Sequence, residues 1–386
     1  MITAINPDNI PQPDNGQKSA VVYAGDYGRC KTLLKDFDVR VIHEFPFINA
    51  FGVYYYAHNI GEIASLSYVK NVVGQSKVYA QVDIARDIMN VGAMHERGIF
   101  GEGVTVAVID TGIYPHLDFM APEERLVKFV DFLEGKEEPY DDNGHGTFVA
   151  GVACGNGLKS CGRYKGIAPR AKLIALRAMN RKGEGGAFGI LEAMQWVYDN
   201  AERYNIRVVC MSFGSALTGA DDPLIEGAEA LWKSGVTVVA AAGNNGPAPE
   251  TIKSPGASSL IITVGAMDDG MRGGEDEDAA AALRRNFLKN YKVAEFSSRG
   301  PVGNLIKPDI VAPAVGITAP SNNDKYFYSK MSGTSVAAPM VAGLACLMLE
   351  NRPELNPGQI KNILLNNAER ILGESRNAQG YGCVKV

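Results

Sequence analysis

The sequence predicts an α/β protein with a doubly wound, mostly parallel sheet, preceded by a small α+β domain. Short apolar runs such as VTVAVID and VTVVAAAGN show little alternation, which is typical of strands buried on both faces. Helical stretches such as ILEAMQWVYDNAERYN separate these runs, and this alternation favours a parallel sheet with helices on both faces. The residues before position 80 instead follow a β-α-β-β-α-β order, which is the ferredoxin-like arrangement.

Composition and charge are those of an ordinary soluble enzyme. The 386 residues are enough for one large domain and one small one, and 46% of them are hydrophobic and 21% charged. The net charge of −5 is mild, so neither a nucleic acid nor an anionic membrane surface is indicated as a partner.

The chain shows no signal for export or membrane insertion. The opening MITAINPDNIPQPDNG is polar and lacks a basic segment followed by an apolar run, so we expect no signal peptide and a cytoplasmic protein. The most apolar stretch, 336–349, contains a proline and a glycine and predicts a buried helix rather than a membrane span.

The cysteines predict neither zinc nor a disulfide framework. Six are spread along the chain without a CxxC pair, so we expect reduced thiols. A disulfide between Cys154 and Cys161, which lie close in sequence, is the alternative.

The first part of the chain divides into a leader, 1–17, and a small domain, 18–79. The elements expected in that domain are a strand at 19–25, a helix at 30–38, two strands within 39–56 joined near 48–50, a helix at 59–69 and a strand at 70–79. About 60 residues bury only a marginal core, so this domain gains from a partner surface.

The large domain, 80–386, carries the parallel sheet. Strands are expected at 104–110, 172–180, 207–214 and 236–244, and helices at 190–205 and 223–235. Ligands bind at the carboxyl ends of such strands, so polar residues at those ends are the first candidates for chemistry. The charged segment 268–290 is expected to be a solvated surface insertion.

Three polar residues stand at such ends, each beside glycine. Asp110 ends the strand in VAVIDTGI, His145 begins an apolar helix in NGHGTFVAG, and Ser335 begins another in SGTSVAAP. Taken singly, they are typical of a turn residue, a loop histidine and a helix N-cap. Together, in the order Asp–His–Ser, they form the set that nucleophilic catalysis by serine requires.

These motifs, with AAAGNNG and FSSRGP, resemble those of the subtilisin family, the subtilases, from about Tyr79 to Gly382. The resemblance implies a subtilisin-like fold and a serine endopeptidase that works through an acyl-enzyme. His145 would take the Ser335 proton and return it to the leaving amine, while Asp110 orients the imidazole. The resemblance makes Asn244 the side-chain donor of the oxyanion hole, with Asn245 as the neighbouring alternative.

The resemblance also assigns substrate contacts. Two segments would flank an extended substrate and pair with its backbone, namely Gly183-Glu184-Gly185 and Ser212-Phe213-Gly214. Lys253 falls where the family has a small residue at the floor of the S1 pocket. It would favour an acidic side chain before the scissile bond, unless it points outward into solvent.

The small domain resembles the family's inhibitory propeptide, which would make the protein a zymogen and its own propeptide an intramolecular inhibitor. SKVYAQ resembles the processing junction, which places self-cleavage between Tyr79 and Ala80. Gln81 and Asp118 fall at ligand positions of the family's principal calcium site, but GNGLKSCGRYK does not match the usual ligand loop. No cofactor is needed for the chemistry, and calcium would be structural.

A subtilase zymogen without an export signal resembles the intracellular or spore-associated bacterial branch of the family. Export by a non-classical route is the alternative. Two further readings stay open. One is a non-catalytic binding or scaffold protein on the same fold, which would usually have lost a triad residue. The other is a protease dedicated to one protein substrate, which would leave casein largely intact.

Overall fold

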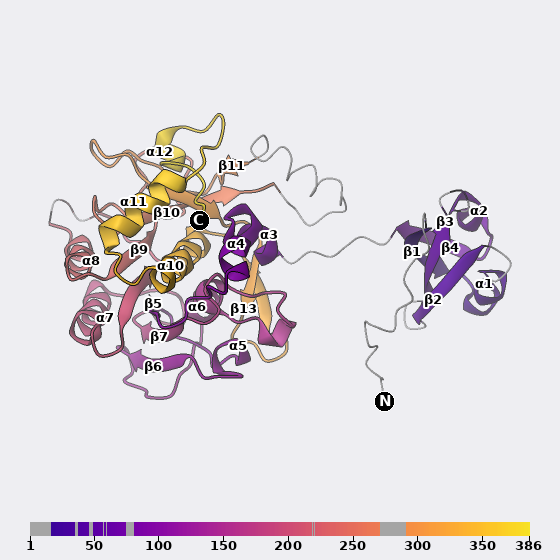
Figure 1. Ribbon diagram of the computed structural model, residues 1–386, viewed down its shortest axis with the longest axis horizontal. Helices are drawn as coiled ribbons and strands as arrows, with labels where there is room; N and C mark the ends of the chain where they lie inside the picture. Colours follow the sequence, from indigo (N-terminus) through magenta and orange to yellow (C-terminus); the bar gives the residue numbers. More distant parts are fainter. Residues whose placement is uncertain are drawn as a thin grey trace. The chain divides into compact units, whose positions relative to one another are not determined.

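A computed structural model describes residues 17–34, 38–45, 49–56, 58, 60–74, 81–217, 219, 221–270 and 291–386. These residues fall into two compact units, one within 17–74 and one from 81 onward (Figure 1). Residues 1–16 of the predicted leader 1–17, the junction at Tyr79 and Ala80, and most of the predicted insertion lie outside the described residues. Gln17, the last residue of the predicted leader, is the first residue of a strand.

The N-terminal unit is the small antiparallel sheet that the sequence predicts. Its elements are β1 (Gln17–Ala24), α1 (Tyr27–Leu33), β2 (Val39–Phe45), β3 (Ala50–Tyr56), α2 (Ile60–Ser65) and β4 (Val69–Gly74). The strand order β2-β3-β1-β4, with antiparallel pairing throughout, is that of the ferredoxin-like arrangement. Val22, Phe51 and Ile63 are fully buried between the sheet and its helices.

Helix α1 begins three residues before the predicted start. The Asp26 side chain accepts a hydrogen bond from Arg29 N at 3.1 Å and so caps the helix at Tyr27. The prediction was wrong here because it followed the apolar pattern and passed over the cap.

The second unit contains a large sheet and a short hairpin. Its strands are β5 (Thr105–Asp110), β6 (Leu126–Asp131), β7 (Lys172–Arg177), β8 (Ile206–Met211), β9 (Thr237–Ala241), β10 (Ile262–Asp268), β11 (Lys292–Val293), β12 (Ile310–Pro313), β13 (Ile317–Pro320) and β14 (Tyr328–Met331). Its helices are α3 (Gln81–Ile88), α4 (Val91–Glu96), α5 (Leu117–Met120), α6 (His145–Cys154), α7 (Ala187–Asn200), α8 (Pro223–Lys233), α10 (Thr334–Asn351), α11 (Pro357–Asn367) and α12 (Arg376–Gln379).

The large sheet is almost entirely parallel, as predicted. Its order is β11-β10-β9-β8-β5-β7-β6, with β12 also pairing β10. Only β11 runs antiparallel to its neighbour among these described strands. Because β9, β8 and β5 are adjacent and parallel, their carboxyl ends lie at one edge of the sheet.

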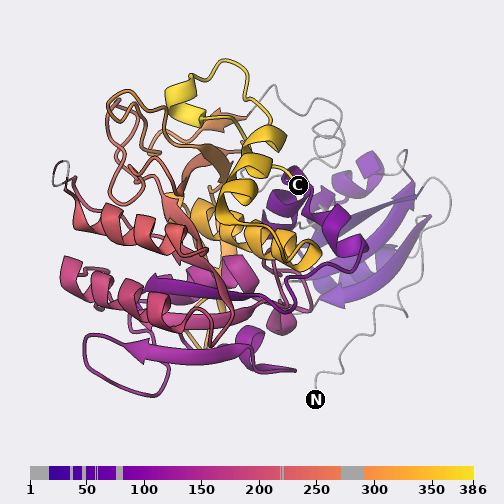
Figure 2. The same ribbon diagram turned by 60° about the vertical axis from the view of Figure 1, so that its left-hand side comes forward.

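Helices cover both faces of this sheet (Figure 2). Alternate residues of β5 point to opposite sides: Val106 and Val108 join a core with α6 and α10, whereas Ala107 and Ile109 join one with α7 and α8. The near-continuous apolar runs in the sequence arise from this two-sided burial.

Helix α10 confirms the predicted buried helix at 336–349. By length and composition it alone among the described helices could cross a membrane, but most of it is enclosed within the unit. It contacts β8, β9, β10 and α6, so it is a core helix.

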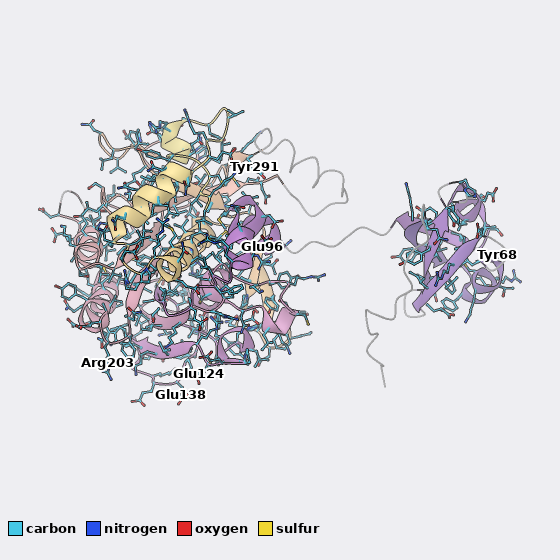
Figure 3. The ribbon with its side chains drawn as sticks, viewed as in Figure 1. Tyr68, Glu96, Glu124, Glu138, Arg203 and Tyr291 are labelled. Atoms are coloured by element: carbon cyan, nitrogen blue, oxygen red, sulfur yellow. The ribbon has the colours of Figure 1, made fainter. Side chains whose placement is uncertain are left out.

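The outermost strand β6 is bordered by acidic side chains. Glu124 precedes it and Glu138 follows it, and both are exposed at the rim of the unit (Figure 3). Charges beside an edge strand discourage pairing with another chain.

Two smaller expectations are settled by the structure. Asp268 is the last residue of β10, so the predicted insertion began too early. All six cysteines are free thiols, with Cys154 buried and Cys161 exposed, so the alternative of a disulfide between them is wrong.

Candidate active site

The sheet edge brings Asp110 and His145 together. Asp110 is the last residue of β5 and His145 the first residue of α6, as predicted. His145 Nδ1 lies 2.7 Å from Asp110 Oδ1. The sharp turn before the helix is made by Gly144, at φ +97°, a conformation that favours glycine.

Asp110 is buried, with 1% of its surface exposed, and its Oδ1 also accepts from Thr111 N at 2.8 Å. Burial lowers the pKa of His145, but the charge and hydrogen bond of Asp110 and the charge of Asp141 outweigh this and raise its pKa. The carboxylate therefore both orients the imidazole and stabilises its protonated form.

A second buried carboxylate, Asp141, ties the two loops together. Its Oδ1 accepts from Thr111 Oγ1 at 2.9 Å and from Gly144 N at 2.8 Å, and its Oδ2 accepts from Thr147 N at 2.9 Å and Thr147 Oγ1 at 2.6 Å. Thr111 Oγ1 in turn accepts from Gly146 N at 2.9 Å. These bonds fix the start of α6 against the end of β5. Sequence reasoning missed Asp141, although it lies four residues before His145 in DDNGH.

Asn244 and Ser335 meet at the start of α10. Asn244 Oδ1 accepts from Thr334 N at 2.9 Å and Thr334 Oγ1 at 3.0 Å, which fixes the amide and directs its Nδ2 elsewhere. A Cβ placed on Gly333 would lie 3.0 Å from Ser335 Oγ, 3.4 Å from Asn244 Nδ2 and 3.7 Å from Ser335 N. The space that glycine leaves open is thus bounded by a serine hydroxyl and two hydrogen-bond donors.

The two halves of the site lie close together. Asn244 follows β9 and Asp110 ends β5, with only β8 between them, and neighbouring strands are about 4.8 Å apart. Helices α6 and α10 pack against one another and begin at this same edge, with His145 and Ser335 in their first turns.

The loop after β7 lies beside the His145 loop. Asn143 Nδ2 donates to Arg181 O at 3.0 Å. Glu184 N donates to Asn180 Oδ1 at 3.2 Å and Glu184 O accepts from Asn180 N at 2.8 Å. Gly183 N also donates to Asn180 O at 2.8 Å, so pairing with a substrate would fall to Gly185 and the Gly183 carbonyl.

The loops after β8 and β9 lie on either side of Lys253. Ser212 is buried, Phe213 packs against the core between the sheet and α7 and α8, and Gly214 is exposed. Lys253 N donates to Ala242 O at 3.0 Å. The predicted substrate segment and Lys253 are therefore neighbours in the fold.

Asp118, a predicted calcium ligand, belongs to a separate hydrogen-bonded cluster. It is fully buried, and Tyr328 OH donates to its two carboxylate oxygens at 2.8 and 3.0 Å, while Lys159 N donates to Oδ1 at 2.9 Å. Burial and the Asp118 carboxylate raise the pKa of Tyr328, so its hydroxyl keeps its proton and donates.

Calcium takes about six to eight oxygen ligands. These donors already occupy the Asp118 carboxylate, so the residues around it do not fit a calcium site. Gln81 begins α3, and its side chain lies outside the described residues.

A family model described as the Subtilase family matches residues 101–382, which include Asp110, His145, Asn244 and Ser335. The chain belongs to the subtilase family. The expected fold, enzyme class and resemblance are thereby confirmed, and this subtilase acts as a serine protease on protein substrates.

Individual relatives agree with this assignment. The chain is 38% identical to "Serine protease AprX" of Bacillus subtilis (strain 168) over 84% of this chain and 75% of that protein. It is 29% identical to "Thermostable alkaline protease" of Halalkalibacterium halodurans, covering 91% of this chain and 85% of that protein.

Among solved structures, this subtilase resembles "S41 Psychrophilic Protease" with a TM-score of 0.62 and 29% identity, over 75% of this chain and 96% of that one. It also resembles "Crystal structure of a cold adapted subtilisin-like serine proteinase", with a TM-score of 0.57 and 28% identity over 73% and 88% of the two chains.

Proposed function

We propose that this subtilase is an endopeptidase in which Ser335 is the nucleophile, His145 the general base and acid, and Asp110 the residue that orients His145. The observation that carries the proposal is the open space at Gly333, where Ser335 Oγ and the donors Asn244 Nδ2 and Ser335 N converge. A substrate carbonyl oxygen in this space would place its carbon beside the Ser335 hydroxyl.

The steps follow from these positions. Ser335 Oγ attacks the carbonyl carbon while His145 takes the hydroxyl proton, and the resulting oxyanion accepts from Asn244 Nδ2 and Ser335 N. The C–N bond then breaks as His145 returns the proton to the amine, leaving an ester on Ser335. Water, deprotonated by His145, hydrolyses this ester and restores the free serine.

The buried Asp110 balances the charge during this sequence. His145 becomes positive when it takes a proton, and the adjacent carboxylate stabilises that form. The raised pKa of His145 agrees with this role.

We further propose that the protein is made as a zymogen whose N-terminal unit is an intramolecular inhibitor, with cleavage between Tyr79 and Ala80. The proposal is supported by the independent four-stranded sheet of 17–74, which has its own core and precedes the catalytic unit. The sequence SKVYAQ follows directly after that unit.

The test follows intact mass over time for the wild type, Ser335→Ala and Ser375→Ala. Ser375 is an exposed serine whose side chain makes no capping hydrogen bond, so it is a matched control. We expect the wild type and Ser375→Ala to split near Tyr79 and to cleave casein, and Ser335→Ala to do neither. Casein cleavage by Ser335→Ala would refute the assignment of the nucleophile, whereas activity without splitting would refute the zymogen alone.

We propose that the Asp118 position is metal-free and held by its hydrogen bonds, and that the catalytic chemistry uses no cofactor. We also propose a reducing, cytoplasmic location, in line with the six free thiols. Cell fractionation with an antibody against the chain tests the location.

A further inference from the structure

The Lys253 side chain lies between two glycines of the active site. A Cβ on Gly214 would come within 2.6 Å of Lys253 Cβ, and a Cβ on Gly243 within 2.6 Å of Lys253 Cγ. The side-chain directions of both glycines therefore point at the Lys253 stem. The stem fills the space between the loop after β8 and the loop after β9.

Backbone hydrogen bonds hold Lys253 in this place from both sides. Its N–H donates to Ala242 O at 3.0 Å, in the loop after β9. The next residue, Ser254, exchanges two bonds with Ser215 at 3.0 and 3.1 Å, in the loop after β8. The start of the side chain is thus fixed between the two loops.

The Lys253 ammonium has no ion pair or hydrogen bond among the described residues, although the side chain is partly buried. Another lysine in the same unit shows the usual arrangement, since the buried Lys307 donates to Asp309 Oδ2 at 2.7 Å. Because no described residue pairs with the Lys253 ammonium, this group is available to an anion from the substrate.

The Lys253 stem lies one residue away from the oxyanion space. Gly243 touches the Lys253 stem and directly precedes Asn244, whose amide bounds the oxyanion space with Ser335. Because Gly243 and Asn244 are consecutive, a substrate residue whose carbonyl enters that space would lie close enough for its side chain to reach Lys253.

We propose that Lys253 makes this protease prefer an acidic residue, glutamate or aspartate, immediately before the scissile bond. The inference rests on the proposed function. A carboxylate entering between the loops forms a charge-assisted hydrogen bond with the ammonium as water leaves. An apolar or amide side chain there removes water from the ammonium without supplying a charge partner, which weakens binding of such a substrate. The proposed self-cleavage after Tyr79 should therefore be slow compared with cleavage after Glu in a peptide.

The experiment compares peptides that differ only in the residue before the cleaved bond, carrying Glu, Gln, Phe or Lys. Hydrogen bonds to charged groups correspond to about 10-fold or more, so we expect kcat/KM for Glu to exceed that for Gln by roughly that factor. In Lys253→Met, which keeps the methylene stem between the glycines, the Glu to Gln ratio should fall to about 1. In Lys253→Glu, the Lys peptide should become the better substrate.

The ratio is taken within one enzyme preparation, so a partly unfolded variant does not distort it. A wild-type Glu to Gln ratio of about 1 or less overturns the inference, as does a ratio unchanged in Lys253→Met. Both results leave the protease assignment intact, because the peptides are still cleaved. Failure of the wild type to cleave any peptide overturns the proposed function, and this inference with it.

Discussion

Asp141 should control the protonation of the active-site histidine, and Asp141→Asn tests this. The carboxylate is 95% buried, since only 5% of its surface is exposed, and it accepts bonds from Thr111, Asn143, Gly144 and Thr147. An asparagine retains the oxygen that faces Thr111 and Gly144. Its Nδ2 group then takes the place of Oδ2 and faces the Thr147 N–H, so two hydrogen-bond donors point at each other.

The cost of this change follows from the contacts. Leaving one buried N–H without an acceptor costs about 1–3 kcal/mol. In domains of roughly 150–250 residues, each kcal/mol lowers Tm by about 2–4 °C. Misplacing His145 at the start of α6 should also reduce kcat, by about tenfold or more.

The pH profile separates positioning from loss of stability. His145 must be neutral to act as a base, so activity falls as pH drops through its pKa. Asp141 contributes to the raised pKa of His145, and loss of its charge lowers that pKa. The acid limb of kcat/KM should therefore move to lower pH in Asp141→Asn.

The measurement is kcat/KM against pH on a peptide substrate, alongside thermal unfolding. Asp142→Asn is the matched control, because this neighbour is 40% exposed and only faces Arg177 Nη2 at 3.5 Å. An acid limb that stays fixed in Asp141→Asn, or moves equally in Asp142→Asn, would refute the reasoning.

Four further outcomes are expected. Gly333→Ala should reduce kcat strongly, because its Cβ would lie 3.0 Å from Ser335 Oγ, in the oxyanion space, and it should also lower Tm, because φ at this position is +157°; unchanged turnover contradicts that geometry. Asn244→Ala should lower kcat by about 10²–10³, the cost found for this donor in subtilisin, with little change in KM. Tyr328→Phe removes the donor to the buried Asp118 and should lower stability by about 1–3 kcal/mol in a urea titration. Tm should be the same in EDTA and in calcium chloride, and a rise with calcium would show that Asp118 binds the ion after all.

The sequence was most informative where the chemistry is local. Asp110, His145 and Ser335 each stand beside glycine at the boundary of an apolar element, and such boundaries are visible in a single segment. The parallel sheet was predictable for the same reason, because strands buried on both faces, such as β5 and β9, have few polar residues.

The remaining features depend on contacts between distant segments. The acid in DDNGH is typical of a turn, and only the fold brings Thr111 to Asp141. Asp118 contacts Tyr328 across 210 positions, so the sequence did not show the hydrogen bond between their side chains. Strand β6, LVKFVD, was not predicted because its exposed Lys128 interrupts the apolar run.

The position of Ser335 on α10 has a consequence for self-digestion. This helix is buried along almost its whole length, and buried core helices open only when the whole unit unfolds. Ser335 therefore keeps its position until the unit unfolds as a whole. If it is the nucleophile, as we propose, each folded molecule remains active while unfolded molecules become its substrates. The lifetime of a concentrated sample should then follow the unfolded fraction of the catalytic unit and shorten steeply as that fraction grows.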